Sequence, residues 1–140
     1  MVYLPPIFRI PPLIAAETGS VLRFETSPSE AVRGADVLYT DVWVSTGDPV
    51  SVRRVRIAAL PPYQVNAALM AVTGYPDTVF MHCLPAYHDL KTQVGREMGE
   101  KFARDSMEIT DEVFESESPI IFREAENHMH TIKAVMTVTL

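Results

Sequence analysis

The sequence contains a single cysteine, Cys83, among 140 residues. One cysteine excludes an internal disulfide and fits a reducing compartment. No apolar run approaches the roughly 20 residues that a membrane-spanning helix needs. The first residues also lack the basic segment followed by an apolar one that is typical of a signal peptide. These absences favour a cytoplasmic protein without a membrane partner.

Positive charge is scarce as well. The chain has 12 Lys and Arg against 18 Asp and Glu, a net charge of −6 and a pI of about 5.1. No stripe of basic residues is present to neutralise phosphates, so a nucleic-acid partner is not expected. Hydrophobic residues make up 47% of the chain, which is typical of a folded globular protein. The length suffices for one domain with a core.

Proline is concentrated at the start, where Pro5, Pro6, Pro11 and Pro12 lie in an apolar stretch. Proline removes backbone donors and opposes both helix interiors and central strands. We therefore expect residues 1–12 to be extended or loose.

The remaining chain alternates between strand-like and helix-like segments. Strands are expected over residues 21–24, 35–40, 78–81 and 120–122. Helices or short turns of helix are expected over residues 13–17, 28–33, 53–60, 67–72, 90–102, 110–114 and 124–140, with Asn66 and Asn127 as candidate caps. Alternation of this kind predicts an α/β fold with a parallel sheet.

Polar residues follow two of the apolar strands. Asp41 and the turn Ser45-Thr46-Gly47 come after the strand at 35–40, and His82 and Cys83 come after the strand at 78–81. In an open parallel sheet, ligands bind just beyond the carboxyl ends of the strands. The two strand ends are therefore expected to form two walls of one site.

The motifs at these strand ends resemble those of ornithine carbamoyltransferases. The resemblance rests on HCLPA with a histidine two residues on (82–88), on DVWVSTG (41–47), and on three further stretches in the same order, at 62–66, 107–115 and 125–134. It runs from about Thr18 to Leu140. The segment 90–103 resembles an insert of the longer bacterial members.

The resemblance implies an incomplete doubly wound parallel sheet, the Rossmann-like second domain of a transcarbamylase. We place a divergent proline-rich start at 1–17 and a partial ornithine-binding domain at 18–140. The first two strands of that domain, and the first domain with its Ser-x-Arg-Thr-Arg phosphate loop, are missing from the sequence. A strand at 37–40 without its central neighbour has a bare edge, which invites pairing with another chain.

The family transfers the carbamoyl group of carbamoyl phosphate to the side-chain amine of L-ornithine, giving citrulline and phosphate. The resemblance implies no cofactor. It implies that Asp41 binds the α-ammonium group of ornithine and that Ser45 and Thr46 belong to a loop that closes over it. The family has Met where this chain has Thr46, which puts substrate preference in doubt. Cys83 and the backbone carbonyl of Leu84 are implied to face the substrate side chain.

The residues implied to act in catalysis are His82, Cys83 and His128. His82 is the candidate carbonyl-polarising group, although a structural histidine is an alternative, and His88 is interpreted as structural. His128 stands where the family has Arg. Histidine is shorter and mostly neutral at pH 7. Losing a buried charged contact costs about 2–5 kcal/mol, so weaker carbamoyl phosphate binding is expected.

Each of these residues also has a plain structural interpretation. Asp41 is a common turn cap, and a free cysteine such as Cys83 is usually a small buried residue. The trio His82, Cys83 and His88 lacks the spacing of a zinc site, so no metal is expected.

Three hypotheses about function follow. The chain is the ornithine-binding part of a transcarbamylase and is inactive alone, because carbamoyl phosphate needs the missing domain. Alternatively, it is a non-catalytic interaction protein that forms a homo- or hetero-oligomer through its exposed sheet edge. A decayed fragment without function is the third.

Overall fold

The computed structural model describes residues 10–45 and 47–139. Pro5, Pro6 and Thr46, which carried predictions above, therefore lie outside the described residues. In chain order the helices are α1 (Ile10–Thr18), α2 (Pro28–Ala31), α3 (Val50–Ala59), a short 3₁₀ helix (Pro61–Tyr63), α4 (Ala67–Val72), α5 (Gln93–Phe102), α6 (Asp111–Phe114) and α7 (Ile121–Thr139). None of the described helices is both long and apolar enough to cross a membrane.

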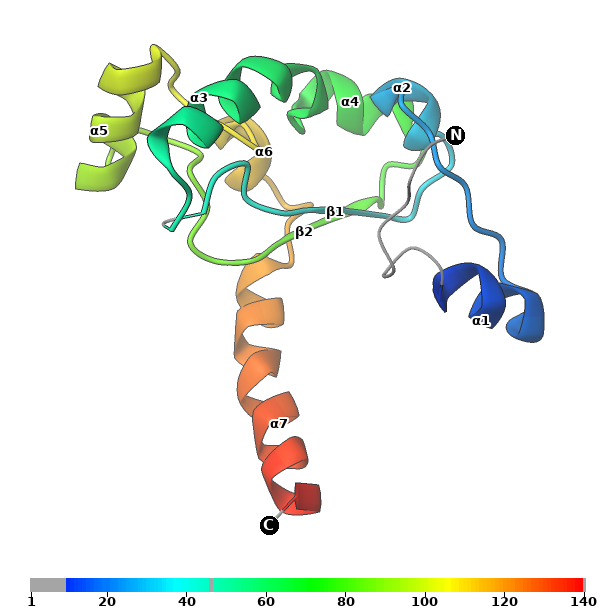
Figure 1. Cartoon of the computed structure of the whole chain (residues 1–140). Coiled ribbons are helices and arrows are strands. Elements are labelled where there is room, and N and C mark those ends of the chain that lie inside the picture. The colour runs from blue at the N-terminus through cyan, green and yellow to red at the C-terminus, as the bar shows by residue number, and fades with distance from the viewer. Residues whose placement is uncertain (1–9, 46, 140) are drawn as a thin grey trace.

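Two parallel strands, β1 (Val37–Thr40) and β2 (Val79–His82), form the sheet. Their register pairs Val37 with Val79 and Thr40 with His82, so both strands end at the same level. In Figure 1 helices α2, α3 and α4 lie above the strands, and α7 leaves below them. The expected α/β class with a parallel sheet is confirmed, in an incomplete form.

The main core lies on one face of the strand pair. Leu38 and Phe80, which share that face, pack with Val32, Val65, Ile109, Val113 and Ile121. A second buried cluster follows β1 directly and contains Trp43, Val44, Ile57 and Met107. Burial of these apolar side chains is the main favourable contribution to the fold.

The free edge of β1 and the opposite face of this strand stay largely exposed in the described chain. Val37 and Tyr39 alternate with Leu38 along the strand, and they are 48% and 57% exposed. In a doubly wound fold both faces of the sheet are packed against helices. The exposure of Val37 and Tyr39 therefore shows which side of this sheet is incomplete.

Two expected strands do not form. Residues 21–24 are irregular and exposed, and they do not pair with the free edge of β1, because local alternation alone does not form a strand. At 120–122 the prediction is wrong for a different reason: α7 already begins at Ile121. Only Pro119 forms a single parallel bridge to Phe80, held by bonds from the Phe80 amide to Ser118 and from the Ile120 amide to Phe80.

Two local predictions about the helices are also corrected. Residues 10–12 are helical rather than loose, because Pro11 and Pro12 lie in the first turn of α1, where a missing N–H costs nothing. Asn127 is not a cap, since it lies inside α7. By contrast, Asn66 caps α4 as predicted, and its side chain accepts a bond from the Leu69 amide at 2.9 Å.

Candidate functional site

The aligned ends of β1 and β2 bring Asp41 and Cys83 together. The Cys83 thiol donates to Asp41 Oδ1 at 3.4 Å, although the two residues are 42 positions apart in the sequence. The same carboxylate oxygen accepts the Val42 amide at 2.8 Å. Burial, together with the bond to Asp41 and its negative charge, raises the pKa of the Cys83 thiol. The thiol is therefore neutral near pH 7, which suits hydrogen bonding better than nucleophilic attack.

A pocket of about 200 Å³ opens beside this pair. It is lined by Val42, Val44, Ser45, Cys83, Leu84, Pro85 and Tyr87. Its walls come from the two segments that follow β1 and β2, as the sequence predicted. The Leu84–Pro85 peptide bond is cis. We call this space the Cys83 pocket.

The loop that carries Ser45 is anchored by Asp48. The Ser45 amide donates to Asp48 Oδ2 at 2.8 Å, and the Asp48 amide donates to the Ser45 carbonyl at 3.1 Å. Arg56 of α3 forms an ion pair with the same carboxylate oxygen at 2.8 Å. The Ser45 side chain remains exposed at the mouth of the Cys83 pocket, where it can contact a ligand.

His82 lies beneath the site, with no exposed surface. Its Nε2 is 3.4 Å from Oε1 of Glu108, which is equally buried, and its Nδ1 contacts the Cys83 carbonyl. Burial lowers the pKa of His82, but Glu108, the Cys83 carbonyl and the charge of Asp41 outweigh this effect, so the pKa lies above its usual value. Glu108 Oε1 also accepts the Tyr87 amide at 3.1 Å. The pair thereby joins both ends of the cysteine motif.

A second, smaller pocket of about 110 Å³ connects the cysteine motif to α7. It is lined by His82, Cys83, Leu84, Glu124, Ala125 and His128, and we call it the α7 pocket. It shares Cys83 and Leu84 with the Cys83 pocket. His128 is thus placed at the same site as the strand ends, on an exposed turn of α7.

Glu124 and Glu108 are site residues to which the sequence analysis gave no role. Glu124 Oε1 accepts the Tyr39 hydroxyl at 2.6 Å, and its Oε2 is buried without a partner among the described residues. The hydrogen bond to Glu124, with the charge of that carboxylate, raises the pKa of Tyr39 to about 12. Glu108 lies in a stretch that was matched to the family, but the sequence gave no signal that it faces His82.

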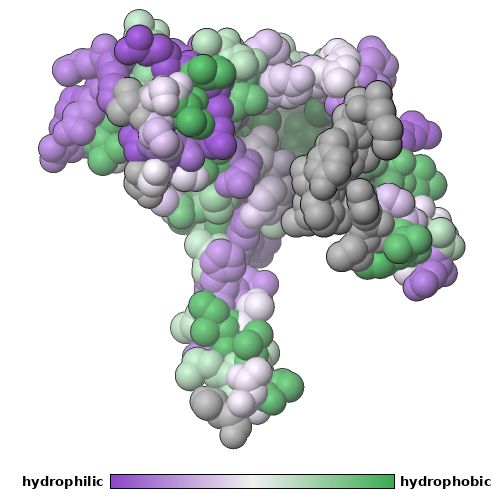
Figure 2. All heavy atoms as spheres, in the orientation of Figure 1, coloured by the Kyte–Doolittle hydropathy of each residue, from purple (hydrophilic) through white to green (hydrophobic). Residues whose placement is uncertain are grey.

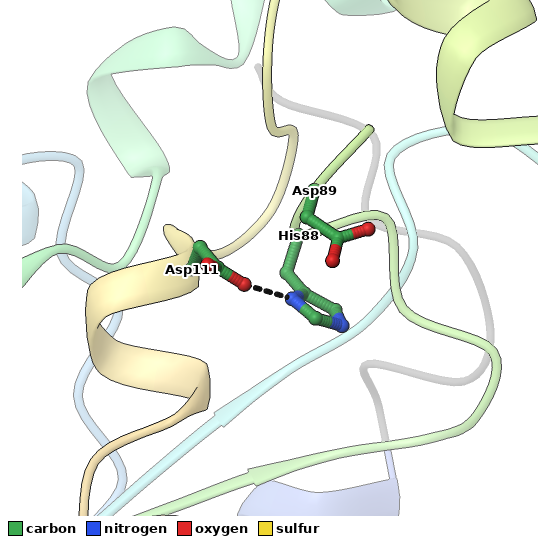
Figure 3. A group of neighbouring side chains, drawn as sticks. All are labelled: His88, Asp89 and Asp111. Atoms are coloured by element: carbon green, nitrogen blue, oxygen red, sulfur yellow. Dashed lines mark hydrogen bonds and ion pairs between the residues drawn. The ribbon is translucent and has the colours of Figure 1, made fainter. Parts of the chain in front are cut away.

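His88 is held away from the pockets. Its Nδ1 lies 2.7 Å from Asp111 Oδ1, and its ring stacks on Phe114 with centroids 3.6 Å apart. His88, Asp89 and Asp111 form the group with metal-ligand geometry in the described chain (Figure 3). The Lys91 ammonium already lies 3.1 Å from Asp89 and 3.6 Å from Asp111. These ion pairs satisfy the carboxylates, and they support a structural role for His88.

A comparison with known protein families identifies the fold. Residues 7–139 match the model of the Asp/Orn binding domain of aspartate/ornithine carbamoyltransferases. The chain belongs to this carbamoyltransferase family. The resemblance seen in the sequence motifs is thereby confirmed.

Similar carbamoyltransferases include the catabolic ornithine carbamoyltransferase of Rhizobium meliloti, 52% identical over 128 residues, and the ornithine carbamoyltransferase of Staphylococcus aureus strain Newman, 50% identical over 127 residues. In each case the match covers 91% of this chain and 38% of the relative. The chain thus spans little more than a third of the length of these curated relatives.

Solved structures of ornithine carbamoyltransferases are similar to this chain as well. The ornithine carbamoyltransferase of Pyrococcus furiosus matches with a TM-score of 0.67 and 36% identity over 87% of this chain and 33% of its own. The anabolic enzyme of Campylobacter jejuni matches with a TM-score of 0.73 and 25% identity, covering 98% of this chain and 39% of its own. The described part is therefore a partial domain of this fold.

Proposed function

We propose that this chain supplies the ornithine-binding side of an ornithine carbamoyltransferase. The observation that carries the proposal is the Asp41–Cys83 pair at the aligned ends of β1 and β2, beside the Cys83 pocket. A carboxylate beside an apolar pocket suits an amino acid whose ammonium group it can bind. We take residues 18–140 as the ornithine-binding unit and 1–17 as a divergent start.

Each site residue has a role in this proposal. Asp41 binds the α-ammonium group of L-ornithine, and Ser45 with Thr46 covers the bound amino acid. Cys83 and the Leu84 carbonyl contact the side-chain amine, and the neutral thiol can accept or donate a hydrogen bond there. His82, held by Glu108, fixes the cysteine motif. His128 faces the α7 pocket, where the carbamoyl group would be held.

The reaction joins the deprotonated amine of ornithine to the carbamoyl carbon. A tetrahedral oxyanion forms, the bond from carbon to the phosphate oxygen breaks, and citrulline and phosphate leave. The protein mainly orients the reactants and stabilises the oxyanion. The sequence contains no Ser-x-Arg-Thr-Arg segment to hold the phosphate. We therefore propose that the chain does not turn over on its own.

Ornithine binding to the purified chain, measured by calorimetry, tests this proposal. We expect Asp41→Asn to weaken binding about 10- to 100-fold, because it removes a charged hydrogen bond to the ammonium group. Asp36→Asn, the same substitution at an exposed residue just before β1, is the matched control and should bind like the parent. Equal binding by both variants, or no binding by a folded parent chain, would refute the proposal.

A second candidate function is a non-catalytic interaction through β1. The exposure of Val37 and Tyr39 beside an unpaired strand edge favours it. Its partner would be a transcarbamylase that adds a strand to this edge. A folded chain that ignores ornithine but co-purifies with an added full-length family member would favour this second function.

A further inference from the structure

The carboxylate of Glu124 has one oxygen with a hydrogen-bond donor and one without. Its Oε1 accepts the Tyr39 hydroxyl, and the pKa of Tyr39 is raised to about 12, mainly by this bond, so the phenol keeps its proton and stays bound to Oε1. Its Oε2 is buried by the described chain and receives no hydrogen bond from it. A buried oxygen without a donor is costly in a native fold, so Oε2 is a candidate contact for a bound group.

The side chain that carries this oxygen lines the α7 pocket. Glu124 and His128 lie four residues apart, on the same face of α7, and both line the pocket together with Cys83 and Leu84. In Figure 2 hydrophilic side chains cover the part of α7 next to the body, and hydrophobic ones gather over its far half. The volume of about 110 Å³ suits a small polar group of a few atoms, since one water molecule takes about 30 Å³ of the liquid.

Glu124 and His128 together offer one hydrogen-bond acceptor and one donor. A carboxylate oxygen accepts hydrogen bonds, whereas a histidine ring donates through at least one nitrogen in either charge state. A carbamoyl group matches this combination, because its NH₂ group donates and its carbonyl oxygen accepts. A carboxylate or phosphate ligand offers only acceptors and would leave Oε2 of Glu124 without a donor.

We infer that Glu124 recognises the carbamoyl NH₂ group through its Oε2, while the His128 ring donates to the carbamoyl oxygen. The Cys83 pocket and the α7 pocket share Cys83 and Leu84, so an amino acid bound in the first pocket extends its side-chain end past these residues into the second. L-citrulline is ornithine with the carbamoyl group on its side-chain amine, and it therefore spans both pockets. The inference rests on the ornithine site proposed above and adds a substrate-contacting residue to it.

Calorimetry of the full chain with L-citrulline and L-norvaline tests the inference. Norvaline is ornithine without the side-chain amine. Both ligands have uncharged side chains, so the difference between them reports contacts of the carbamoyl group rather than net charge. We expect the parent to bind citrulline about 10-fold or more tightly than norvaline, and Glu124→Ala to remove most of this preference, because a hydrogen bond to a charged acceptor is lost. Norvaline itself should bind the parent and the variant equally.

Three further variants separate this contact from a general effect on the fold. Glu126→Ala removes a carboxylate from an exposed position of the same helix outside the α7 pocket, and it should keep the preference for citrulline. Tyr39→Phe removes the bond to Oε1 but leaves Oε2 in place, so it should keep most of the preference. Glu124→Gln retains the size and an uncharged acceptor, so its preference should fall between those of the parent and Glu124→Ala. Circular dichroism reports whether each variant is folded.

Ornithine binding by the parent chain distinguishes failure of this inference from failure of the proposed function. A folded parent that binds ornithine but does not prefer citrulline over norvaline would overturn the inference alone. An unchanged preference in folded Glu124→Ala and Glu124→Gln would do the same. So would an equal loss in Tyr39→Phe and Glu124→Ala, because Glu124 would then act only through its bond to Tyr39. A folded parent that binds none of the three amino acids would overturn both.

Discussion

At the scale of single residues, the contact between Cys83 and Asp41 sets the chemistry of the site. The carboxylate accepts a hydrogen bond from the thiol and carries a negative charge, so it favours the neutral thiol over the thiolate. This is the opposite of a cysteine nucleophile, which needs a positive neighbour to lower its pKa. In the proposed function Cys83 therefore binds and orients the substrate as a neutral thiol and forms no covalent intermediate.

Alkylation of Cys83 provides a direct measurement of this effect. We expect Asp41→Asn to speed the reaction with iodoacetamide several-fold near pH 8, since removing the negative charge lowers the pKa of the thiol. Cys83 is the single cysteine of the chain, so the rate refers to one site. Asp36→Asn should react at the parent rate. An unchanged or slower reaction in Asp41→Asn would contradict the assigned cause of the shift.

The buried His82–Glu108 pair makes stability depend on pH. The pKa of His82 is raised above the ordinary 6.5, so the protonated ring is favoured in the folded chain. The stabilisation that protonated His82 contributes is complete below pH 6.5, and it is lost as the pH rises through the raised pKa of the folded chain. We expect Glu108→Gln to lose about 2–4 kcal/mol of unfolding free energy in acid, and less at higher pH. Urea unfolding across this range, with Glu112→Gln on the exposed surface as control, measures the difference. A loss independent of pH would exclude this pairing as its cause.

At the scale of elements, sequence patterns predicted most of the helices and both strands of the site. Asn66 before an apolar run indicated the start of α4, and the apolar runs that form β1 and β2 led directly to Asp41 and Cys83. The strand expected at 21–24 failed because strand formation needs a neighbour, which the local sequence cannot supply. Glu124 and Tyr39 could not be paired in advance, since they are 85 positions apart in the sequence.

The cap of α4 is the element-scale prediction that a single substitution tests. Asn66→Ala removes the bond to the Leu69 amide and should cost about 1 kcal/mol of unfolding free energy. Asn127→Ala makes the same change in the exposed interior of α7, where alanine is the better helix former, and should cost nothing. Equal losses in urea unfolding would show that Asn66 does not act as a cap.

Helix α5 depends on a close approach at Gly95. A Cβ there would lie 2.4 Å from the Asp89 carbonyl oxygen, whereas one at Gly99 would mainly meet the flexible end of Leu90 at 2.6 Å. Gly95→Ala should therefore cost about 2–3 kcal/mol of unfolding free energy, since the backbone must move. Gly99→Ala should cost clearly less, because the Leu90 side chain can turn away. Thermal unfolding of both variants checks the order, and the reverse order would contradict this packing.

At the scale of the whole molecule, the described chain brings the segments of the candidate site together but leaves part of its sheet exposed. The strand ends, the cysteine motif and the start of α7 are assembled, while Val37, Tyr39 and the free edge of β1 stay exposed in the described chain. The sequence motifs were sufficient to predict the family, and they also predicted that the segments after β1 and β2 lie together. They could not predict that α7 would stand away from the body, because this depends on what lies opposite the helix rather than on its own residues.

Citrulline formation tests the whole-molecule proposal. The purified chain should produce none from ornithine and carbamoyl phosphate, because the sequence holds no segment for the phosphate. Adding a polypeptide that carries the first domain of a family member should restore measurable turnover. The Asp41→Asn chain with the same added domain is the control, because it lacks the carboxylate that is proposed to bind ornithine. Citrulline made by the chain alone would contradict the proposal that the chain binds ornithine but does not turn over on its own.

The position of the single tryptophan has a practical consequence. Trp43 is 5% exposed, lies two residues after Asp41, and has the Arg104 guanidinium 5.4 Å from its ring. All tryptophan fluorescence of the chain therefore arises from one buried place next to the Cys83 pocket. Ligand entry at Asp41 is expected to change the emission. The chain thus carries an intrinsic optical probe of ligand occupancy at its candidate site.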